Sequence, residues 1–280
     1  MYQIIALDVD GTLLTSAHTL SPRVRRAVRA ARSRGIHIAL ATGKLLVSVA
    51  ALVEELGLSG PQITCNGAVT VDAAGGAPVA FVALDAPECW DTLAALRAAA
   101  PDLGIAWYTP DAIYTDAPHG PLDAVLAAYH EPPLRHVARL DASLPTPAKF
   151  LITGSPERLA SVRAAIAPRL GSAVQVIGTT PDFLEMMHPR ATKGEALRAV
   201  MRLLDVPRQR VLALGDGEND LALIEAAGCG VAMANAIPAL RQRAAHVTAS
   251  NDEDGAALVI EAVLAGRFVA AANAGIAKRP

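Results

Sequence analysis

The chain has 280 residues, a formal net charge of -2 and a hydrophobic share of 52%. This length suffices for one large domain or two smaller ones with a sizeable core. Acidic and basic residues are spread along the chain, which argues against nucleic-acid binding, because phosphate contacts need clustered Lys and Arg. No apolar run reaches the roughly 20 residues that a membrane helix needs.

The start of the chain and its three cysteines both favour a location in the cytoplasm. An acidic residue, Asp8, lies where a signal peptide would be apolar, and no basic segment precedes it, so we expect no export. Cys65, Cys89 and Cys229 are far apart and lack CxxC spacing, which favours free thiols over a disulfide or zinc framework. The composition therefore predicts a cytoplasmic globular protein, and nothing in it indicates an obligate protein partner.

Three short apolar runs without alternation each end at a polar residue: 4–7 before Asp8, 36–41 before Thr42 and 211–214 before Asp216. Such runs fit strands that are buried on both faces. Helices are expected over 22–34, 45–56, 192–204 and 218–227. This alternation predicts a doubly wound, Rossmann-like α/β core, whose ligand site lies beyond the carboxyl ends of its parallel strands.

The middle of the chain breaks this rhythm. It contains expected strands over 105–108, 113–115, 150–153 and 174–177, and expected helices over 87–99, 121–129 and 156–170. We interpret 84–184 as an inserted α+β cap domain, with 1–83 and 185–280 forming the core. The Ala-rich tail 265–280 is expected to be a loosely ordered end.

The segment Asp8-Val9-Asp10-Gly11-Thr12 follows the first strand. A turn at Gly11 lets both carboxylates converge, so that one can attack phosphorus while the other handles protons. The alternative is a solvated turn in which Asp-Gly merely suits the backbone.

The loop Gly215-Asp216-Gly217-Glu218-Asn219-Asp220 follows a later strand. Its hard oxygen donors suit Mg2+, although an acidic helix N-terminus is favourable through the helix dipole alone.

Two further clusters favour phosphate binding. Thr42-Gly43-Lys44 is expected to open a helix whose hydroxyl and N–H groups can hold phosphate oxygens, although an ordinary Thr cap would look the same. Lys193 begins another helix, where the dipole disfavours a cation. It can neutralise a phosphate among the acids, whereas a surface lysine is the alternative.

The remaining histidines carry little signal. His119, His130 and His136 lie in the insertion without ligand spacing, and we expect them to be surface residues. His188 flanks the return to the core and is also interpreted as an ordinary residue.

The four clusters, in this order, resemble the haloacid dehalogenase superfamily of phosphatases, and the resemblance covers essentially the whole chain. The insertion looks like the cap of the Cof-like, type IIB branch, to which Asn66-Gly67-Ala68 and the stretch 231–236 are also similar. The resemblance implies a Mg2+-dependent phosphomonoester hydrolase that acts on a small phosphorylated metabolite.

By this resemblance, Asp8 is the nucleophile and Asp10 the general acid and then base. It further implies that Mg2+ is held by Asp8, the backbone carbonyl of Asp10 and Asp216, with Asp220 close by or acting through water.

It also implies that Thr42, Gly43 and Lys193 hold the phosphoryl group and that Asn219 supports substrate or Lys193. The branch usually has Arg where this chain has Lys44. Lys44 is a candidate substrate contact, but its ammonium group cannot bind phosphate through two N–H groups as the guanidinium group of Arg does.

Two expectations concern selectivity and proton transfer. Asp10, among other carboxylates, should retain a proton for the leaving oxygen. Cap loops 108–112 and 116–120 are expected to select the substrate.

Rival functions remain open to different degrees. A phosphomutase or phosphotransferase of the phosphomannomutase type has similar motifs and stays the alternative. A signalling receiver domain is disfavoured by Asp10, the cap and Lys193, and a dinucleotide-binding module by the lack of GxGxxG after any strand.

Overall fold

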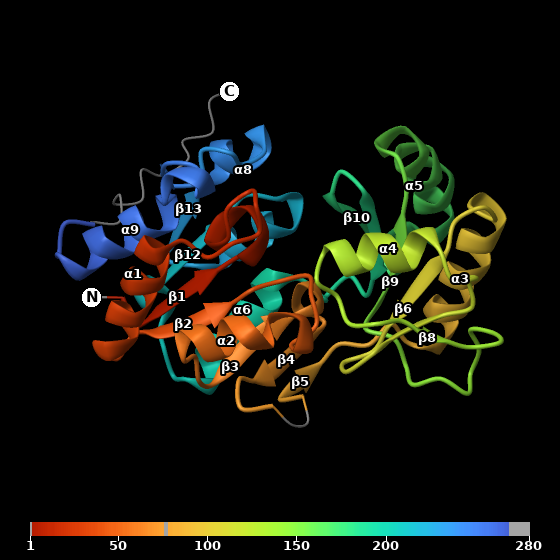
Figure 1. Cartoon of the computed structure of the whole chain (residues 1–280), viewed down its shortest axis with the longest axis horizontal. Coiled ribbons are helices and arrows are strands. Elements are labelled where there is room, and N and C mark those ends of the chain that lie inside the picture. The colour runs from red at the N-terminus through yellow and green to blue at the C-terminus, as the bar shows by residue number, and fades with distance from the viewer. Residues whose placement is uncertain (1, 76–77, 269–280) are drawn as a thin grey trace.

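The computed structural model describes residues 2–75 and 78–268. The chain forms two lobes, a core lobe from both ends of the chain and a cap lobe from its middle (Figure 1). None of the helices in these ranges is both long and apolar enough to cross a membrane. The predicted loosely ordered tail falls mostly beyond the described residues.

The core lobe contains a five-stranded sheet in which all pairings are parallel, in the order β14-β13-β12-β1-β2. Its strands are β1 (Ile4–Leu7), β2 (His37–Leu40), β12 (Val211–Gly215), β13 (Cys229–Ala232) and β14 (His246–Val247). Its helices are α1 (Pro22–Ser33), α2 (Ala50–Leu56), α6 (Lys193–Leu203), α7 (Leu221–Ala226), α8 (Pro238–Arg243) and α9 (Gly255–Leu264). A three-stranded antiparallel sheet of β3 (Pro61–Thr64), β4 (Val69–Asp72) and β5 (Ala80–Phe81) lies beside β2.

Alternate residues of the central strands pack on opposite layers of helix. Ile5 and Leu7 of β1 belong to the cluster that includes α1 and α9, whereas Ile4 and Ala6 belong to the cluster that includes α6 and α7. Because both faces of the sheet are covered, its strands are apolar throughout. The prediction of a doubly wound α/β core is confirmed.

The cap lobe contains a six-stranded sheet in the order β10-β11-β9-β6-β7-β8. Its strands are β6 (Ile105–Tyr108), β7 (Ile113–Thr115), β8 (Arg135–His136), β9 (Lys149–Thr153), β10 (Gln175–Thr180) and β11 (Phe183–Met187). Its helices are α3 (Ala86–Ala99), α4 (Pro121–Ala128) and α5 (Pro156–Leu170). Helices α3 and α5 cover the face that carries Trp107 and Phe150, and α4 packs in the cluster with Tyr108 and Leu151 on the other face.

The predicted division between cap and core, at 184/185, lies at strand β11. Strand β11 pairs with β9 along its whole length, from Phe183 to Met187, so that division falls inside a strand. We propose that the cap runs from about residue 84 to the end of β11. The cluster with Tyr108 also contains Cys65 and Val69 of the core, so the two lobes share packed apolar surface.

One predicted helix begins later than expected. The sequence indicated a helix from residue 45, but α2 begins at Ala50 after a short 3-10 turn, Val47–Val49. The preceding loop is held by other backbone bonds: the carbonyl oxygens of Lys44 and Thr42 accept from the N–H groups of Cys65 and Asn66. Thr42 therefore does not cap a helix, contrary to the expectation from sequence.

Candidate active site

Asp8, Lys193 and Asp220 form a buried ion triad where the parallel strands end. Asp8 follows β1, Lys193 begins α6 and Asp220 ends the turn after β12. The Nζ atom of Lys193 donates to Asp8 Oδ1 at 2.6 Å and to Asp220 Oδ1 at 2.7 Å, and its side chain is 0% exposed. Three segments that are distant in sequence thus converge on one ammonium group.

Asp216 faces the same cluster from the end of β12. Its Oδ1 accepts from the hydroxyl of Thr12 at 2.8 Å. Gly11 turns the chain at φ +79°, and a Cβ atom there would lie 2.4 Å from Asp216 Oδ2. Glycine at this position therefore satisfies both a left-handed turn and a close approach to a carboxylate.

The cluster carries more negative than positive charge. Ligand atoms of Asp8, Asp216 and Asp220 lie within 4.8 Å of one another. Burial, and then repulsion from Asp220, raises the pKa of Asp216 to about 6 and raises that of Asp8 well above its usual range. Burial alone would lower the pKa of Lys193, but Asp220 and Asp8 raise it overall.

The donor set fits a hard divalent cation. Three carboxylates against the single ammonium of Lys193 leave two negative charges uncompensated, which matches one divalent cation. Asp220 has less capacity for direct coordination, because its Oδ2 already accepts the N–H groups of Asp216 and Gly217 at 2.9 and 3.0 Å.

The side chain of Asp10 turns away from this cluster. Its Oδ1 accepts from Lys44 Nζ at 2.6 Å and lies 3.3 Å from His18 Nδ1. The expectation that other carboxylates surround Asp10 is therefore wrong, because its hydrogen-bond partners are the ammonium group of Lys44 and the ring of His18. Lys44 is buried and reaches this carboxylate, so it lies next to the proposed proton-transfer group.

Thr42 and Gly43 are brought beside Asn66. The Thr42 hydroxyl accepts from the N–H group of Lys44 at 3.1 Å, and Thr42 itself is buried. Asn219 Nδ2 donates to Asn66 Oδ1 at 2.8 Å, and Asn66 Nδ2 donates to Glu185 Oε2 at 2.7 Å. Asn219 is thus linked through Asn66 to the cap.

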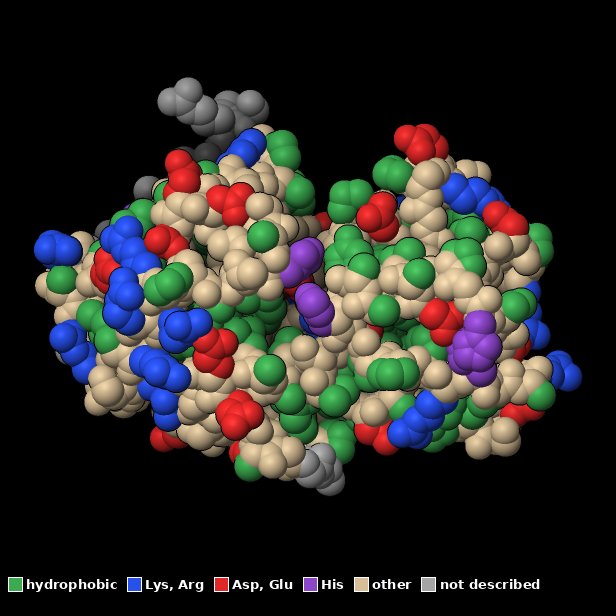
Figure 2. Space-filling view, viewed as in Figure 1, with side chains coloured by type: hydrophobic (Ala, Val, Ile, Leu, Met, Phe, Trp, Pro, Cys, Tyr) green, Lys and Arg blue, Asp and Glu red, His purple; other side chains and the backbone are tan. Residues whose placement is uncertain are grey.

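A cavity of about 270 Å³ joins these groups to the cap. On the core side it is lined by Asp8, Asp10, Gly43, Lys44, Asp216, Asn219 and Asp220, among others. On the cap side it is lined by Tyr129, Glu131, Lys149, Leu151, Thr179, Thr180, Pro181, Phe183 and Glu185. Figure 2 shows the surface hollowed between the two lobes, where this cavity lies.

The predicted selectivity loops were wrong. Residues 108–112 and 116–120 are described by the structure but do not line this cavity, whose cap side comes from the end of α4, from β9 and from the β10–β11 hairpin. The hairpin reaches the core where β10 contacts the Glu218–Asp220 turn.

Sequence reasoning also missed a buried ion pair within this cavity. Lys149 and Glu185 are 1% and 2% exposed, and their charged atoms are 2.8 Å apart. Each is the one charged residue in an otherwise apolar strand, Lys149 in β9 and Glu185 in β11. A lone charge in an apolar run was a signal that could have revealed them.

Comparison with known proteins identifies the family. Residues 5–260 match the family described as haloacid dehalogenase-like hydrolase. The chain is similar to the putative phosphatase YxeH of Bacillus subtilis, with 34% identity over 95% of this chain and 100% of the relative. It is 30% identical to an HMP-PP phosphatase of Cronobacter sakazakii, over 88% of this chain and 89% of the relative.

A solved structure agrees with these sequence relatives. A haloacid dehalogenase-like hydrolase from Bacteroides thetaiotaomicron superposes with a TM-score of 0.82 and 30% identity, covering 94% of this chain and 100% of the other. The resemblance drawn from the four motifs is thereby confirmed. The chain belongs to the haloacid dehalogenase-like hydrolases and is a phosphatase.

Proposed function

We propose that the protein is a Mg2+-dependent phosphomonoester hydrolase that acts on a small phosphorylated metabolite through a phosphoaspartate at Asp8. The observation that carries this proposal is the buried convergence of Asp8, Lys193 and Asp220, with Asp216 beside them, at the floor of the cavity. A nucleophile, a cation and hard metal ligands in one place are the parts that phosphoryl transfer needs.

Mg2+ would be held by the carboxylates of Asp8 and Asp216 and the backbone carbonyl of Asp10, with Asp220 acting on Lys193 and the loop. This division is supported by the hydrogen bonds that already occupy both oxygens of Asp220. When bound, the ion would neutralise charge on the phosphoryl group and lower its repulsion by the carboxylates.

Asp8 attacks phosphorus with the oxygen that Lys193 does not hold. Lys193 binds Asp8 Oδ1 and fixes the orientation of the carboxylate while also offering positive charge to the transferring group. Thr42 and Gly43 are proposed to hold phosphate oxygens through the Thr hydroxyl and the backbone N–H groups of their loop.

Asp10 is proposed to give a proton to the leaving oxygen and then to take one from the attacking water. The ion pair with Lys44 holds the carboxylate of Asp10 in place, so this pair must loosen before Asp10 can reach the leaving oxygen. An arriving phosphate dianion competes for Lys44 and would release Asp10. Lys44 is therefore proposed both to contact substrate and to time the proton transfer.

The cavity supports a small, hydroxyl-bearing substrate such as a sugar phosphate. Its volume of about 270 Å³ suits a small metabolite rather than a polymer. Its cap side offers the acceptors Glu131 and Glu185 and the hydroxyl groups of Thr179 and Thr180. The relative from Cronobacter sakazakii, an HMP-PP phosphatase, supports a small phosphorylated substrate.

The three buried free cysteines support a cytoplasmic location.

The test is phosphate release from a panel of phosphomonoesters, with Mg2+ and with EDTA, for the wild type and Asp8→Asn. We expect metal-dependent release by the wild type and its loss in the variant. If both proteins released phosphate equally, Asp8 would not be the nucleophile. Transfer to a second sugar hydroxyl without free phosphate would instead establish the phosphotransferase alternative.

A further inference from the structure

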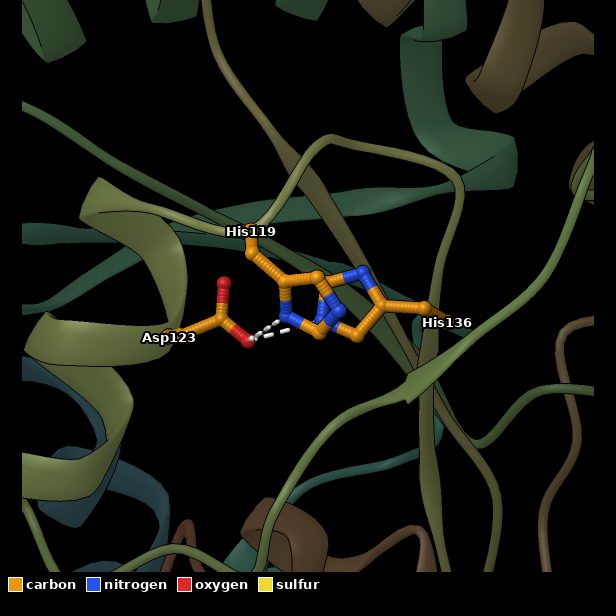
Figure 3. A group of neighbouring side chains, drawn as sticks. All are labelled: His119, Asp123 and His136. Atoms are coloured by element: carbon orange, nitrogen blue, oxygen red, sulfur yellow. Dashed lines mark hydrogen bonds and ion pairs between the residues drawn. The ribbon is translucent and has the colours of Figure 1, made fainter.

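Two histidines of the cap, His119 and His136, both contact the carboxylate of Asp123. None of the three residues lines the active-site cavity. Asp123 Oδ1 lies 2.7 Å from His136 Nε2 and 3.5 Å from His119 Nδ1. Figure 3 shows the two rings overlapping, with a nitrogen of each directed at the same Asp123 oxygen. Their ring centroids are 3.6 Å apart. The sequence analysis had treated these histidines as separate surface residues.

The contacts of His136 indicate which of its ring nitrogens carries the proton in the neutral form. Its Nδ1 lies 3.0 Å from the carbonyl oxygen of Ala117, which can only accept, so Nδ1 carries a proton. In the neutral ring, Nε2 then presents a lone pair to the carboxylate oxygen 2.7 Å away. Two acceptors at this distance require a proton or a metal cation between them.

The position of His119 favours the metal. Its side chain is 81% exposed, yet its ring stacks on His136 and its Nδ1 points at the same oxygen. A proton shared by His136 and Asp123 would leave His119 without a role, whereas a single metal ion can bind one ligand atom from each of the three residues, which lie within 4.8 Å of one another. A metal-bound histidine also commonly donates its other ring N–H to a backbone carbonyl, as His136 does to Ala117.

We propose that His119, Asp123 and His136 bind a first-row divalent cation of the Zn2+ class. Their ligand atoms all lie within 4.8 Å of one another. Two imidazoles and one carboxylate suit Zn2+ and its neighbours, and they discriminate against Mg2+, which prefers oxygen ligands only. The exposure of His119 leaves the remaining coordination positions accessible to water.

The site would join two separate elements of the cap. His119 and Asp123 lie at the start of α4, and His136 is in β8. Asp123 Oδ2 already accepts from the N–H group of Gly120, which orients the carboxylate at the helix start. The chain just past the other end of α4 carries Tyr129 and Glu131, which line the active-site cavity. A bound ion would therefore stabilise the cap element that forms one wall of that cavity.

The proposal is tested by calorimetric titration of the full chain with Zn2+ in excess Mg2+, which keeps the active-site carboxylates occupied. We expect one Zn2+ equivalent in the wild type and roughly 100-fold weaker binding in His119→Ala and in Asp123→Asn. Co2+ is a second probe, because its visible absorption reports histidine ligands. The matched control is His130→Asn, an exposed cap residue at φ +61°, a backbone conformation that Asn tolerates.

The outcomes separate this site from the active site. Zn2+ binding that survives Asp216→Asn but is lost in His119→Ala supports the proposal, as does a Zn2+-dependent rise in Tm seen in the control and not in His119→Ala. Equal Zn2+ binding by the wild type and His119→Ala, or none by the wild type, would overturn it. The variants lie outside the phosphate chemistry, so neither result depends on the proposed function.

Discussion

The ammonium group of Lys149, on cap strand β9, donates a hydrogen bond of 2.8 Å to the backbone carbonyl oxygen of Gly43, which follows β2 in the core. The same Nζ atom is 2.8 Å from Glu185 Oε2, to which Asn66 of the core also donates. The loop that carries Thr42 and Gly43 is thus held directly by a buried cap residue. Substrate binding and lobe position should be coupled through this contact.

Replacing Lys149 with Met should destabilise the protein by about 3–5 kcal/mol, because it leaves the buried carboxylate of Glu185 without its cation. Met preserves most of the apolar volume beside Tyr108, over whose ring the ammonium lies at 4.4 Å. Urea unfolding, followed by circular dichroism, measures the change. The loss of the bond to Gly43 should also raise KM.

The control is the double variant Lys149→Met with Glu185→Gln. A neutral amide in place of the carboxylate removes the unpaired buried charge, so we expect the double variant to recover a large part of the lost stability. If the single and double variants were equally unstable, the cost would come from packing and not from charge.

Lys44→Met should lower kcat/KM about 10- to 100-fold, because the charged hydrogen bond that it removes is worth about 1.5–3 kcal/mol. Lys44→Arg should retain activity within a few fold, since it keeps the charge and can reach both Asp10 and a phosphate. Steady-state kinetics across pH check this. An unchanged pH profile in Lys44→Met would contradict a role in timing proton transfer.

The sequence predicted the doubly wound core because three of its strands, β1, β2 and β12, are short apolar runs followed closely by polar residues. The rule that ligand sites lie at strand ends predicted that Asp8, Thr42 and Asp216 lie near one another, and in the structure Asp8 and Asp216 belong to one acidic cluster. Lys193, predicted only as the start of a helix, donates to Asp8 in that cluster. The three cap helices and strands β6, β7, β9 and β10 were also predicted, whereas β8 and β11 were not. The end of the insertion could not be located from the sequence, because β11 is apolar on both sides of Glu185 and the predicted boundary falls within it.

What the sequence did not reveal depends on side-chain direction and long-range contact. Asp10 belongs to the same motif as Asp8, but the turn at Gly11 sends its carboxylate toward Lys44 instead of the acidic cluster. His119, just before α4, and His136, in β8, come together across the intervening residues 120–135, which no local pattern encodes. Spacing along the chain cannot report such contacts between separate elements.

Stabilisation by Mg2+ should increase with pH through about 6. The pKa of Asp216 is raised from its ordinary value of 3.8 to about 6, mainly by burial and then by Asp220. Without metal, the stability associated with this raised pKa is fully present below pH 3.8 and is lost as pH rises through about 6. Mg2+ binds the ionised form and competes with the proton.

The measurement is Tm with and without millimolar Mg2+ at several pH values from 4.5 to 8, about the range over which Asp216 titrates. The Mg2+-dependent rise in Tm should be small at the acidic end and should level off above neutral pH. Asp216→Asn should flatten the curve, whereas Asp252→Asn, at an exposed carboxylate bonded to Ser16, should leave it unchanged.

Gly11→Ala should impair metal binding and activity far more than it impairs folding. Its Cβ atom would meet Asp216 Oδ2 at 2.4 Å, so the carboxylate must move, and a displacement of about 1 Å at a reacting centre can cost about 100-fold in rate. The positive φ adds about 1–2 kcal/mol of backbone strain. Gly35→Ala is a matched control, because Gly35 has φ +77° and nothing lies within 4 Å of its added Cβ atom. Both variants should lose similar stability, measured by Tm, but only Gly11→Ala should show weaker Mg2+ binding and slower phosphate release. Equal kinetics in the two variants would mean that the contact between Gly11 and Asp216 does not position the metal ligand.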